Sequence, residues 1–314
     1  MPSPVRLAMA QMLVEGGRKE ANLARACARI AEAAAAGAQI IVLPEALDLG
    51  WTHPSALTDA EPVPGGAPCE RLRDAAARHG LFVCAGSTEL ADDKSLFEKA
   101  GRARRTGFQP VCLRASSPWH HLSGVGLETP EETGQRHCPT FQTGSKVFNA
   151  AVLIGPDGGL LQHHRKLNEL EIGRAFYARG DRLGVAGTPF GRIGMMICAD
   201  AFAPGQVVSR TLGLMGAELI LSPCAWAVPV DHDNASEPYG QLWRDNHGPV
   251  ARDFGLWIAG VSNVGPITGG PWIGRRCIGN SLLVGPDGEP ALTGPYGADA
   301  EALLLADLPL GTRA

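Results

Sequence analysis

Several features that would place a protein in a special class are missing from this chain. Its 314 residues carry a net charge of −4 with a pI near 6.1, so no basic excess marks a surface for nucleic acid or an anionic membrane. No apolar run reaches the roughly 18–20 residues of a membrane helix. The first residues lack the apolar core and cleavage site of a secretion signal. We therefore expect a soluble, cytoplasmic protein with no nucleic acid or membrane partner.

Cysteine pairs with the spacing of a metal site are also missing. The eight cysteines are Cys27, Cys69, Cys84, Cys112, Cys138, Cys198, Cys224 and Cys277. No two of them form a C-x-x-C motif and none lies with histidines at zinc-finger spacing, so we expect no metal site. Without a secretion signal, a disulfide framework is not expected either. Most of these thiols should be small, buried apolar side chains.

The chain does contain a regular alternation of strands and helices. Hydrophobic residues make up 45% of it and charged residues 19%, which is typical of a globular domain. Apolar runs predict strands at 4–12, 39–45, 81–87, 147–154, 191–198, 218–223 and 256–263, and helical spacing predicts helices at 20–37, 68–79, 206–216 and 240–254. Because a strand such as 39–45 is continuously apolar, its sheet should be buried on both faces. The sequence therefore predicts an α/β fold.

Two segments share one pattern. NAAVLIGPDGGLLQHH (149–164) and GNSLLVGPDGEPALTG (279–294) each contain an apolar strand, a Gly-Pro-Asp-Gly turn and a second strand. In such a turn proline fixes φ, aspartate caps the turn and glycine takes the left-handed conformation, so both segments predict hairpins. Either they occupy equivalent places in two sheets, or they share only a common type of turn.

Residues 91–146 interrupt the alternation. This segment has no sustained period of 2 or 3.6 and contains four prolines, at 110, 118, 130 and 139. Connections longer than about 12–15 residues without secondary structure are uncommon inside compact domains. We interpret 91–146 as an exposed, irregular insertion in a single domain that spans 1–314.

Three reactive side chains follow apolar strands. Glu45 comes after QIIVLP, Lys166 after LLQHHR and Cys198 after GRIGMMI. Active sites of α/β proteins lie at the carboxyl ends of strands, so these three groups can meet in one pocket. A thiol at such a place can be partly exposed, and a nearby cation or helix N-terminus would lower its pKa. Taken singly, each is better explained as a structural thiol or a solvated charge.

The sequences around these residues, taken together and in order, resemble one family. LPEALDLGW (43–51), HHRKLNELE (163–171) and GRIGMMICADAF (191–202) are similar to the Glu, Lys and Cys motifs of the nitrilase superfamily of carbon–nitrogen hydrolases. The resemblance extends over nearly all of the chain outside 91–146. It implies a four-layer α-β-β-α sandwich, a catalytic set that needs no cofactor, and a homodimer or a higher homo-oligomer.

The resemblance also implies a role for each residue. Cys198 would be the nucleophile and Glu45 the general base, while Lys166 and the backbone N–H of Ala199 would stabilise the oxyanion. The implied reaction is hydrolysis of a small amide or N-carbamoyl compound through a cysteine thioester, with release of ammonia. The alternatives are hydrolysis of a nitrile to a carboxylic acid and ammonia, and a non-catalytic binding protein built on the same fold.

Other residues of the site are less well defined by the sequence. Members of this family usually carry a second glutamate shortly after the lysine, and the spacing leaves Glu169 and Glu171 both open. Substrate contacts are expected from Trp51, Ala199 and Trp226, since each lies next to a catalytic motif or follows the end of a strand.

Two arrangements outside this family are disfavoured. A papain-like pair of Cys198 with His232 or His247 lacks any local protease signature. A metal held by His163 and His164 is disfavoured because neighbours along a strand point to opposite faces. We expect these two histidines to be polar side chains facing solvent.

Overall fold

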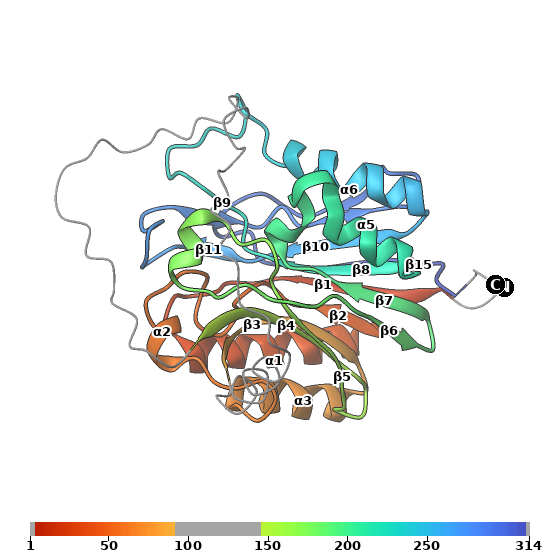
Figure 1. The fold of residues 1–314 in the computed structure, drawn as a ribbon, viewed down its shortest axis with the longest axis horizontal. Coiled ribbons are helices and arrows are strands. Elements are labelled where there is room, and N and C mark those ends of the chain that lie inside the picture. The colour runs from red at the N-terminus through yellow and green to blue at the C-terminus, as the bar shows by residue number, and fades with distance from the viewer. Residues whose placement is uncertain (1–3, 92–145, 312–314) are drawn as a thin grey trace, which may run out of the picture. The chain divides into compact units, whose positions relative to one another are not determined.

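The two central layers of the fold are six-stranded mixed sheets. The computed structural model describes residues 4–91 and 146–311, and all structural statements below concern these residues. The sheets lie face to face, with helices on both outer sides, so the layers follow the order α-β-β-α (Figure 1). This confirms the expected α/β sandwich. The expected insertion at 91–146 falls, apart from its two ends, outside the described residues, and the single domain spanning 1–314 stays a prediction.

The first sheet is built around three parallel strands. Its strand order is β15 (Ala302–Leu308), β1 (Val5–Gln11), β2 (Ile40–Val42), β3 (Phe82–Leu90), β4 (Val147–Ile154) and β5 (Leu160–Arg165). β1, β2 and β3 are parallel, and the other neighbours pair antiparallel. The helices α1 (Lys19–Ala35) and α3 (Ala67–His79) connect the parallel strands, and their apolar faces pack on the outer side of this sheet.

The second sheet repeats this plan. Its order is β14 (Pro290–Thr293), β13 (Leu282–Val284), β10 (Trp257–Ser262), β8 (Leu219–Cys224), β7 (Gly191–Met195) and β6 (Val185–Thr188), with α5 (Val207–Leu214) and α6 (Gln241–Phe254) outside it. β7, β8 and β10 are parallel. Each sheet thus has three parallel strands, one antiparallel strand on one side and an antiparallel hairpin on the other. The two Gly-Pro-Asp-Gly hairpins, β4–β5 and β13–β14, are these edge hairpins, so they do occupy equivalent places.

Apolar side chains from both sheets fill the space between them. Met9 and Val42 of the first sheet belong to the same buried cluster as Met195 and Leu221 of the second. Because every second residue of a strand points to the same face, the other residues of β1 and β2 pack against α1 and α3. Burial of a large apolar side chain contributes about 1.5–3 kcal/mol, so this interface fixes how the sheets lie against each other.

Two expected strands are shorter than the sequence indicated. The strand expected at 39–45 ends at Val42, because Pro44 has no N–H to continue the ladder. The strand expected at 191–198 ends at Met195, because the chain turns at Cys198 into a short 3-10 helix, η2 (Cys198–Phe202). Both chain segments therefore leave their sheets just before a candidate catalytic residue.

Several small elements complete the described part of the fold. They are α2 (Ala56–Asp59), the 3-10 helices η1 (Glu171–Ala175) and η3 (Pro204–Gln206), and a three-stranded sheet of β11 (Val264–Pro266), β12 (Arg276–Ile278) and β9 (Ala227–Val228). Within the described ranges, no helix is both long enough and apolar enough to cross a membrane.

Candidate active site

A buried cluster of charges joins three of the expected residues. The ammonium of Lys166 donates to Glu45 Oε1 at 2.7 Å and to Glu169 Oε1 at 3.0 Å. All three side chains are at most 5% exposed. Glu169 is therefore the glutamate that lies beside the lysine, whereas Glu171 is exposed on η1. The turn that follows β5 thus brings Glu169, and not Glu171, against the lysine.

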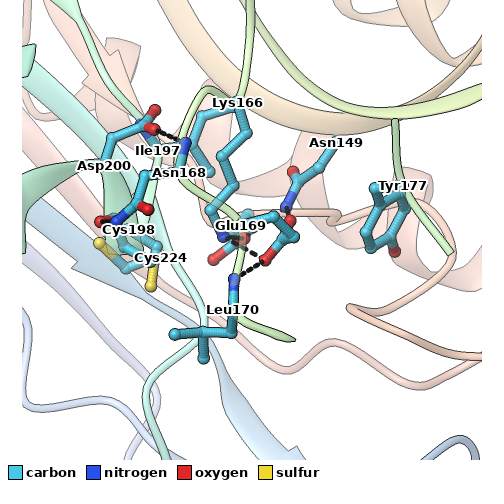
Figure 2. A network of polar contacts seen from close by, with 12 residues as sticks. Asn149, Lys166, Asn168, Glu169, Leu170, Tyr177, Ile197, Cys198, Asp200 and Cys224 are labelled. Atoms are coloured by element: carbon cyan, nitrogen blue, oxygen red, sulfur yellow. Dashed lines mark hydrogen bonds and ion pairs between the residues drawn. The ribbon is translucent and has the colours of Figure 1, made fainter. Parts of the chain in front are cut away.

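Asn149 of β4 completes the cluster. Its amide nitrogen donates to Glu45 Oε1 at 2.6 Å and to Glu169 Oε2 at 3.0 Å, and Figure 2 shows it beside Glu169. The backbone N–H of Leu170 donates to Glu169 Oε1 at 3.0 Å. Lys166, Asn149 and the Leu170 N–H all donate to the two carboxyl groups, so the cluster supplies donors to both glutamates around one ammonium.

Close backbone packing positions Glu45. The segment around Pro44 lies against β3, where the Gly86 N–H donates to the Pro44 carbonyl at 3.0 Å. A Cβ atom on Gly86 would lie 2.5 Å from the Glu45 Cα, so only glycine allows this approach. From the second sheet, the Cys224 carbonyl accepts a hydrogen bond from the Glu45 N–H at 3.2 Å. Glu45 is thus fixed between the two sheets.

Cys198 lies at a strained turn on the other side of the cluster. Its φ is 44°, a left-handed conformation that is unusual for a residue other than glycine. Its N–H donates to the Ser222 hydroxyl at 3.2 Å. Ser222 and Cys224 belong to β8, the neighbour of β7, and Figure 2 shows the thiols of Cys198 and Cys224 side by side.

The electrostatics of Cys198 differ from the expectation. The side chain is 8% exposed. Burial raises the pKa of its thiol well above the usual value, the neighbouring Cys224 and the charge of Glu45 raise it further, and Lys166 opposes them. Lys166 does lower the pKa of this thiol, as predicted for a nearby cation, but burial, Cys224 and Glu45 outweigh it, so the expected net lowering does not occur. In the resting site Cys198 is a neutral thiol.

The charges of the lysine and of the second glutamate shift in a related way. Burial alone would lower the pKa of Lys166, but Glu169 and Glu45 hold it well above its ordinary value. Burial raises the pKa of Glu169, and Lys166 acts against this shift. Lys166 is therefore a permanent cation at neutral pH.

A second buried carboxylate ties the lysine segment to the cysteine turn. Asp200 Oδ1 accepts hydrogen bonds from the backbone N–H groups of Leu167, at 2.9 Å, and Asn168, at 2.7 Å. Its Oδ2 accepts from the Ile197 N–H at 3.0 Å and faces His164 Nε2 at 2.9 Å. Burial would raise the pKa of Asp200, but His164 and these N–H groups hold it below its usual value.

The residues expected to contact substrate lie in different surroundings. The ring of Trp51 lies 5.7 Å from the Lys166 ammonium and packs edge-on against Trp272. Ala199 is buried next to Cys198, and its carbonyl accepts a hydrogen bond from Asn168 at 2.7 Å. Trp226 stacks on Trp243 of α6 with ring centroids 4.5 Å apart, which is a packing contact with the outer helix. Of these side chains, Trp51 is the one that lies against the charged cluster.

The histidines do not behave as the sequence suggested. His163 lies 2.8 Å from Glu89, and His164 points to the opposite face, toward Asp200. The prediction that both face solvent is wrong for His164, which is 2% exposed because Asp200 gives it a buried partner.

Neither His232 nor His247 forms a papain-like pair with Cys198 in the described part of the chain. His247 has no hydrogen-bond partner at either ring nitrogen, and Nε2 of His232 has none either. Among the residues that the structure describes, no group of three or more histidine, cysteine, aspartate or glutamate side chains is arranged to hold a metal ion.

Sequence reasoning missed Asn149, and it assigned no role to His164 or Asp200. Asn149 and Asp200 carried a signal, because a polar residue inside an apolar strand run or next to a candidate nucleophile needs a buried partner. Asn149 interrupts the run VFNAAVLI, and Asp200 follows Cys198 by two residues.

An α-β-β-α sandwich with a buried glutamate–lysine–glutamate cluster beside a cysteine turn defines a class of hydrolytic protein. The carbon–nitrogen hydrolase family model matches residues 6–103 and 119–314. The chain therefore belongs to the carbon–nitrogen hydrolase family of the nitrilase superfamily.

Individual relatives are more distant. The chain is 26% identical over 230 residues to a nitrilase of Pyrococcus abyssi, which covers 72% of this chain and 66% of that protein. It is 28% identical over 232 residues to the omega-amidase NIT2 of Xenopus tropicalis, which covers 70% of this chain and 63% of the relative. The chain thus spans slightly less than two thirds of these relatives. Among solved structures, a variant of the Nesterenkonia amidase from the nitrilase superfamily superposes with a TM-score of 0.67 at 20% identity, covering 98% of this chain and 92% of that one.

Proposed function

We propose that this protein hydrolyses the carbon–nitrogen bond of a small amide or N-carbamoyl compound through a thioester on Cys198. The observation that carries the proposal is the buried Glu45–Lys166–Glu169 cluster beside a neutral cysteine thiol. It combines a base, a fixed cation and a nucleophile within one site, which are the groups that acyl transfer from an amide requires.

The first half of the reaction follows from these charges. Because Cys198 rests as a thiol, a base must take its proton as the sulfur attacks the carbonyl carbon, and Glu45 serves as that base. The negative charge that develops on the carbonyl oxygen is stabilised by the Lys166 ammonium and by the Ala199 N–H. Glu45 then returns the proton to the nitrogen, the carbon–nitrogen bond breaks, and ammonia leaves a thioester.

The second half consumes water. Glu45 takes a proton from a water molecule, whose oxygen attacks the thioester carbon. The carbon–sulfur bond breaks, the proton returns to the sulfur, and the carboxylic acid leaves. Glu169 and Asn149 keep Lys166 and Glu45 in place through both halves, because they hold the same atoms before and after the acyl group is transferred.

Relatives support an amide as the substrate. NIT2 relatives are omega-amidases, and one Nesterenkonia variant carries the acetamide moiety of fluoroacetamide covalently on its active-site cysteine. The Pyrococcus relative is a nitrilase, so nitriles belong in the same assay as amides and N-carbamoyl compounds. Ammonia release across these three classes is expected to be fastest for an amide or an N-carbamoyl compound.

A covalent probe tests the nucleophile directly. Fluoroacetamide should add one acetamide moiety to the intact protein, located on the peptide that contains Cys198. Cys198→Ala should abolish the adduct and the turnover. Glu45→Gln keeps the shape but removes the base, so turnover should fall about 10²–10⁴-fold. Full activity of Cys198→Ala, or an adduct on another cysteine, would refute the proposal.

A further inference from the structure

The structure contains a buried histidine–carboxylate contact, between His164 and Asp200, directly behind the candidate catalytic residues. His164 lies in β5, two residues before Lys166, and Asp200 lies in η2, two residues after Cys198. Their nearest atoms, Nε2 and Oδ2, are 2.9 Å apart, and both side chains are at most 1% exposed. Neither residue is one of the groups assigned above to proton transfer, nucleophilic attack or oxyanion stabilisation.

The Asp200 carboxylate is a junction between two backbone segments. On one side it accepts the N–H groups of Leu167 and Asn168, which immediately follow Lys166. On the other side it accepts the N–H of Ile197, which immediately precedes Cys198. Asn168 adds a second link, from its side-chain nitrogen to the Ala199 carbonyl at 2.7 Å.

The two backbone segments that Asp200 joins carry Lys166 and Cys198, and the proposed reaction depends on the separation of these two side chains. Lys166 comes from the first sheet and Cys198 from the second, so no hydrogen-bond ladder sets their separation. Cys198 is also held at φ 44°, a conformation that persists only where the surroundings impose it. Hydrogen bonds to the Asp200 carboxylate link the Lys166 segment to the Cys198 segment and also hold the turn at Cys198. The carboxylate does both only while it keeps its orientation.

We propose that His164 and Asp200 are positioning residues, in which the hydrogen bond from His164 Nε2 holds the Asp200 carboxylate so that it fixes Lys166 relative to Cys198. The inference rests on the proposed function, because it assigns the pair to the same reaction. The pair touches no substrate and transfers no proton. His164 donates one hydrogen bond to Asp200, from Nε2, and the other three donors to Asp200 are backbone N–H groups.

The position of this donor allows a matched pair of variants. The amide nitrogen of glutamine can reach the place of Nε2, whereas that of asparagine is one methylene too short. We expect His164→Asn to lower kcat about 10²-fold with KM changed less than about threefold, which is the cost of a displacement near 1 Å at the reacting groups. His164→Gln should retain at least about a tenth of the parent kcat.

Three further measurements separate positioning from general stability. Thermal unfolding midpoints of the Gln and Asn variants should agree within about 3 °C, so that their difference in kcat does not reflect loss of the fold. His163→Gln, on the opposite face of β5, should leave kcat unchanged. If His164→Asn does not fold, Asn168→Ala tests the same junction from its other side, and it should lower kcat about three- to tenfold for the loss of one hydrogen bond.

The readouts distinguish the failure of this inference from the failure of the proposed function. The kcat and KM for the best substrate of the assay, and the rate at which fluoroacetamide labels Cys198, are measured first on the parent protein. A parent that neither turns over nor labels overturns the proposed function, and the inference with it. An active parent with an equally active His164→Asn variant, or equal losses in the Gln and Asn variants, overturns the positioning role alone.

Discussion

Lys166 Nζ lies 2.7 Å from Glu45 Oε1, although 121 residues separate the two in sequence. The contact joins the end of β5 to the segment that follows β2 in the same sheet. Glu169 is a second carboxylate beside the same buried ammonium. Burial raises the pKa of Cys198 most, and Cys224 and the charge of Glu45 add to this shift. The proposed mechanism therefore activates the thiol by proton transfer during attack and not by storing a thiolate.

The two glutamates after Lys166 provide a matched test of the cluster. Glu169→Gln would place an amide NH₂ at one of two positions that both now accept hydrogen bonds, Oε1 from Lys166 and the Leu170 N–H and Oε2 from Asn149. One buried donor would then face another donor, so we expect kcat to fall at least about tenfold. Glu171→Gln, on the exposed side of η1, should stay within about twofold of the parent in the same ammonia assay. Equal losses in the two variants would contradict the assignment.

The lysine itself should not tolerate arginine. Its compact ammonium fits between two carboxylates at 2.7 and 3.0 Å, whereas a planar guanidinium is longer and needs a fork of acceptors. We expect Lys166→Arg to lower kcat about 10²-fold, comparable to the loss of an oxyanion donor. Lys19→Arg, in a partly exposed pair with Glu61, is the control and should be fully active. A Lys166→Arg enzyme with the parent rate would show that charge alone suffices there.

The parts of this fold that follow from local patterns were predictable. The apolar runs and helical spacing placed the parallel strands and their helices within a few residues, and the turn chemistry of Gly-Pro-Asp-Gly placed both hairpins. Strand ends were less predictable, because Pro44 and the turn at Cys198 stop the ladder inside an apolar run. The sheet β11–β12–β9 was missed because each of its strands has only two or three residues.

The site was predictable in its residues and not in its electrostatics. Motifs identified Glu45, Lys166 and Cys198, but nothing in the spacing showed that Asn149 would bridge two carboxylates. His164 was expected to face solvent because a histidine in sequence carries no sign of its partner. Asp200 comes from the other sheet, and only the folded chain brings it within 2.9 Å of His164. Burial by the folded chain is the main cause of the raised pKa of Cys198, and Cys224 and Glu45, both distant in sequence, add to it.

Cys224 offers a way to alter the nucleophile without replacing it. Burial raises the pKa of Cys198 most, and the contact with Cys224 adds to that shift. Cys224→Ala removes this contribution, so alkylation of Cys198 by iodoacetamide should move to lower pH while turnover is kept. Cys84→Ala is the control, since the Cys84 thiol contacts Met195 between the sheets. Labelling followed by peptide mapping over a pH series measures the effect, and a midpoint that is unchanged or higher would refute it.

We further expect the protein to associate through α5. Leu214 is 77% exposed and lies seven residues after Val207, which is 55% exposed, so the two share one face of this helix. Leu212, by contrast, is fully buried and belongs to the core. A homodimer or higher homo-oligomer would cover Leu214. Leu214→Asp should therefore shift sedimentation at micromolar concentration toward the 33.0 kDa monomer. Ile273→Asp, at an isoleucine that is 67% exposed, should not. A parent protein that is itself monomeric would exclude this interface.

His247 should make the fold sensitive to acid. It is fully buried in α6 with no hydrogen-bond partner at either ring nitrogen, and burial lowers its pKa to about 4. The unfolded chain has a histidine pKa near 6.5, so well above that pH the ring is neutral in both states. Its titration then contributes nothing to the free energy of unfolding. As the pH falls from 6.5 toward 4, the unfolded chain binds a proton that the folded chain does not, and the free energy of unfolding decreases. At pH 5 the loss is about 2 kcal/mol.

His247→Leu removes this titration, so the difference in unfolding free energy between pH 7 and pH 5, measured with urea, should be about 2 kcal/mol smaller than in the parent. Between pH 7 and pH 8 both proteins should change alike, and an identical acid response in the two would rule out His247 as its source.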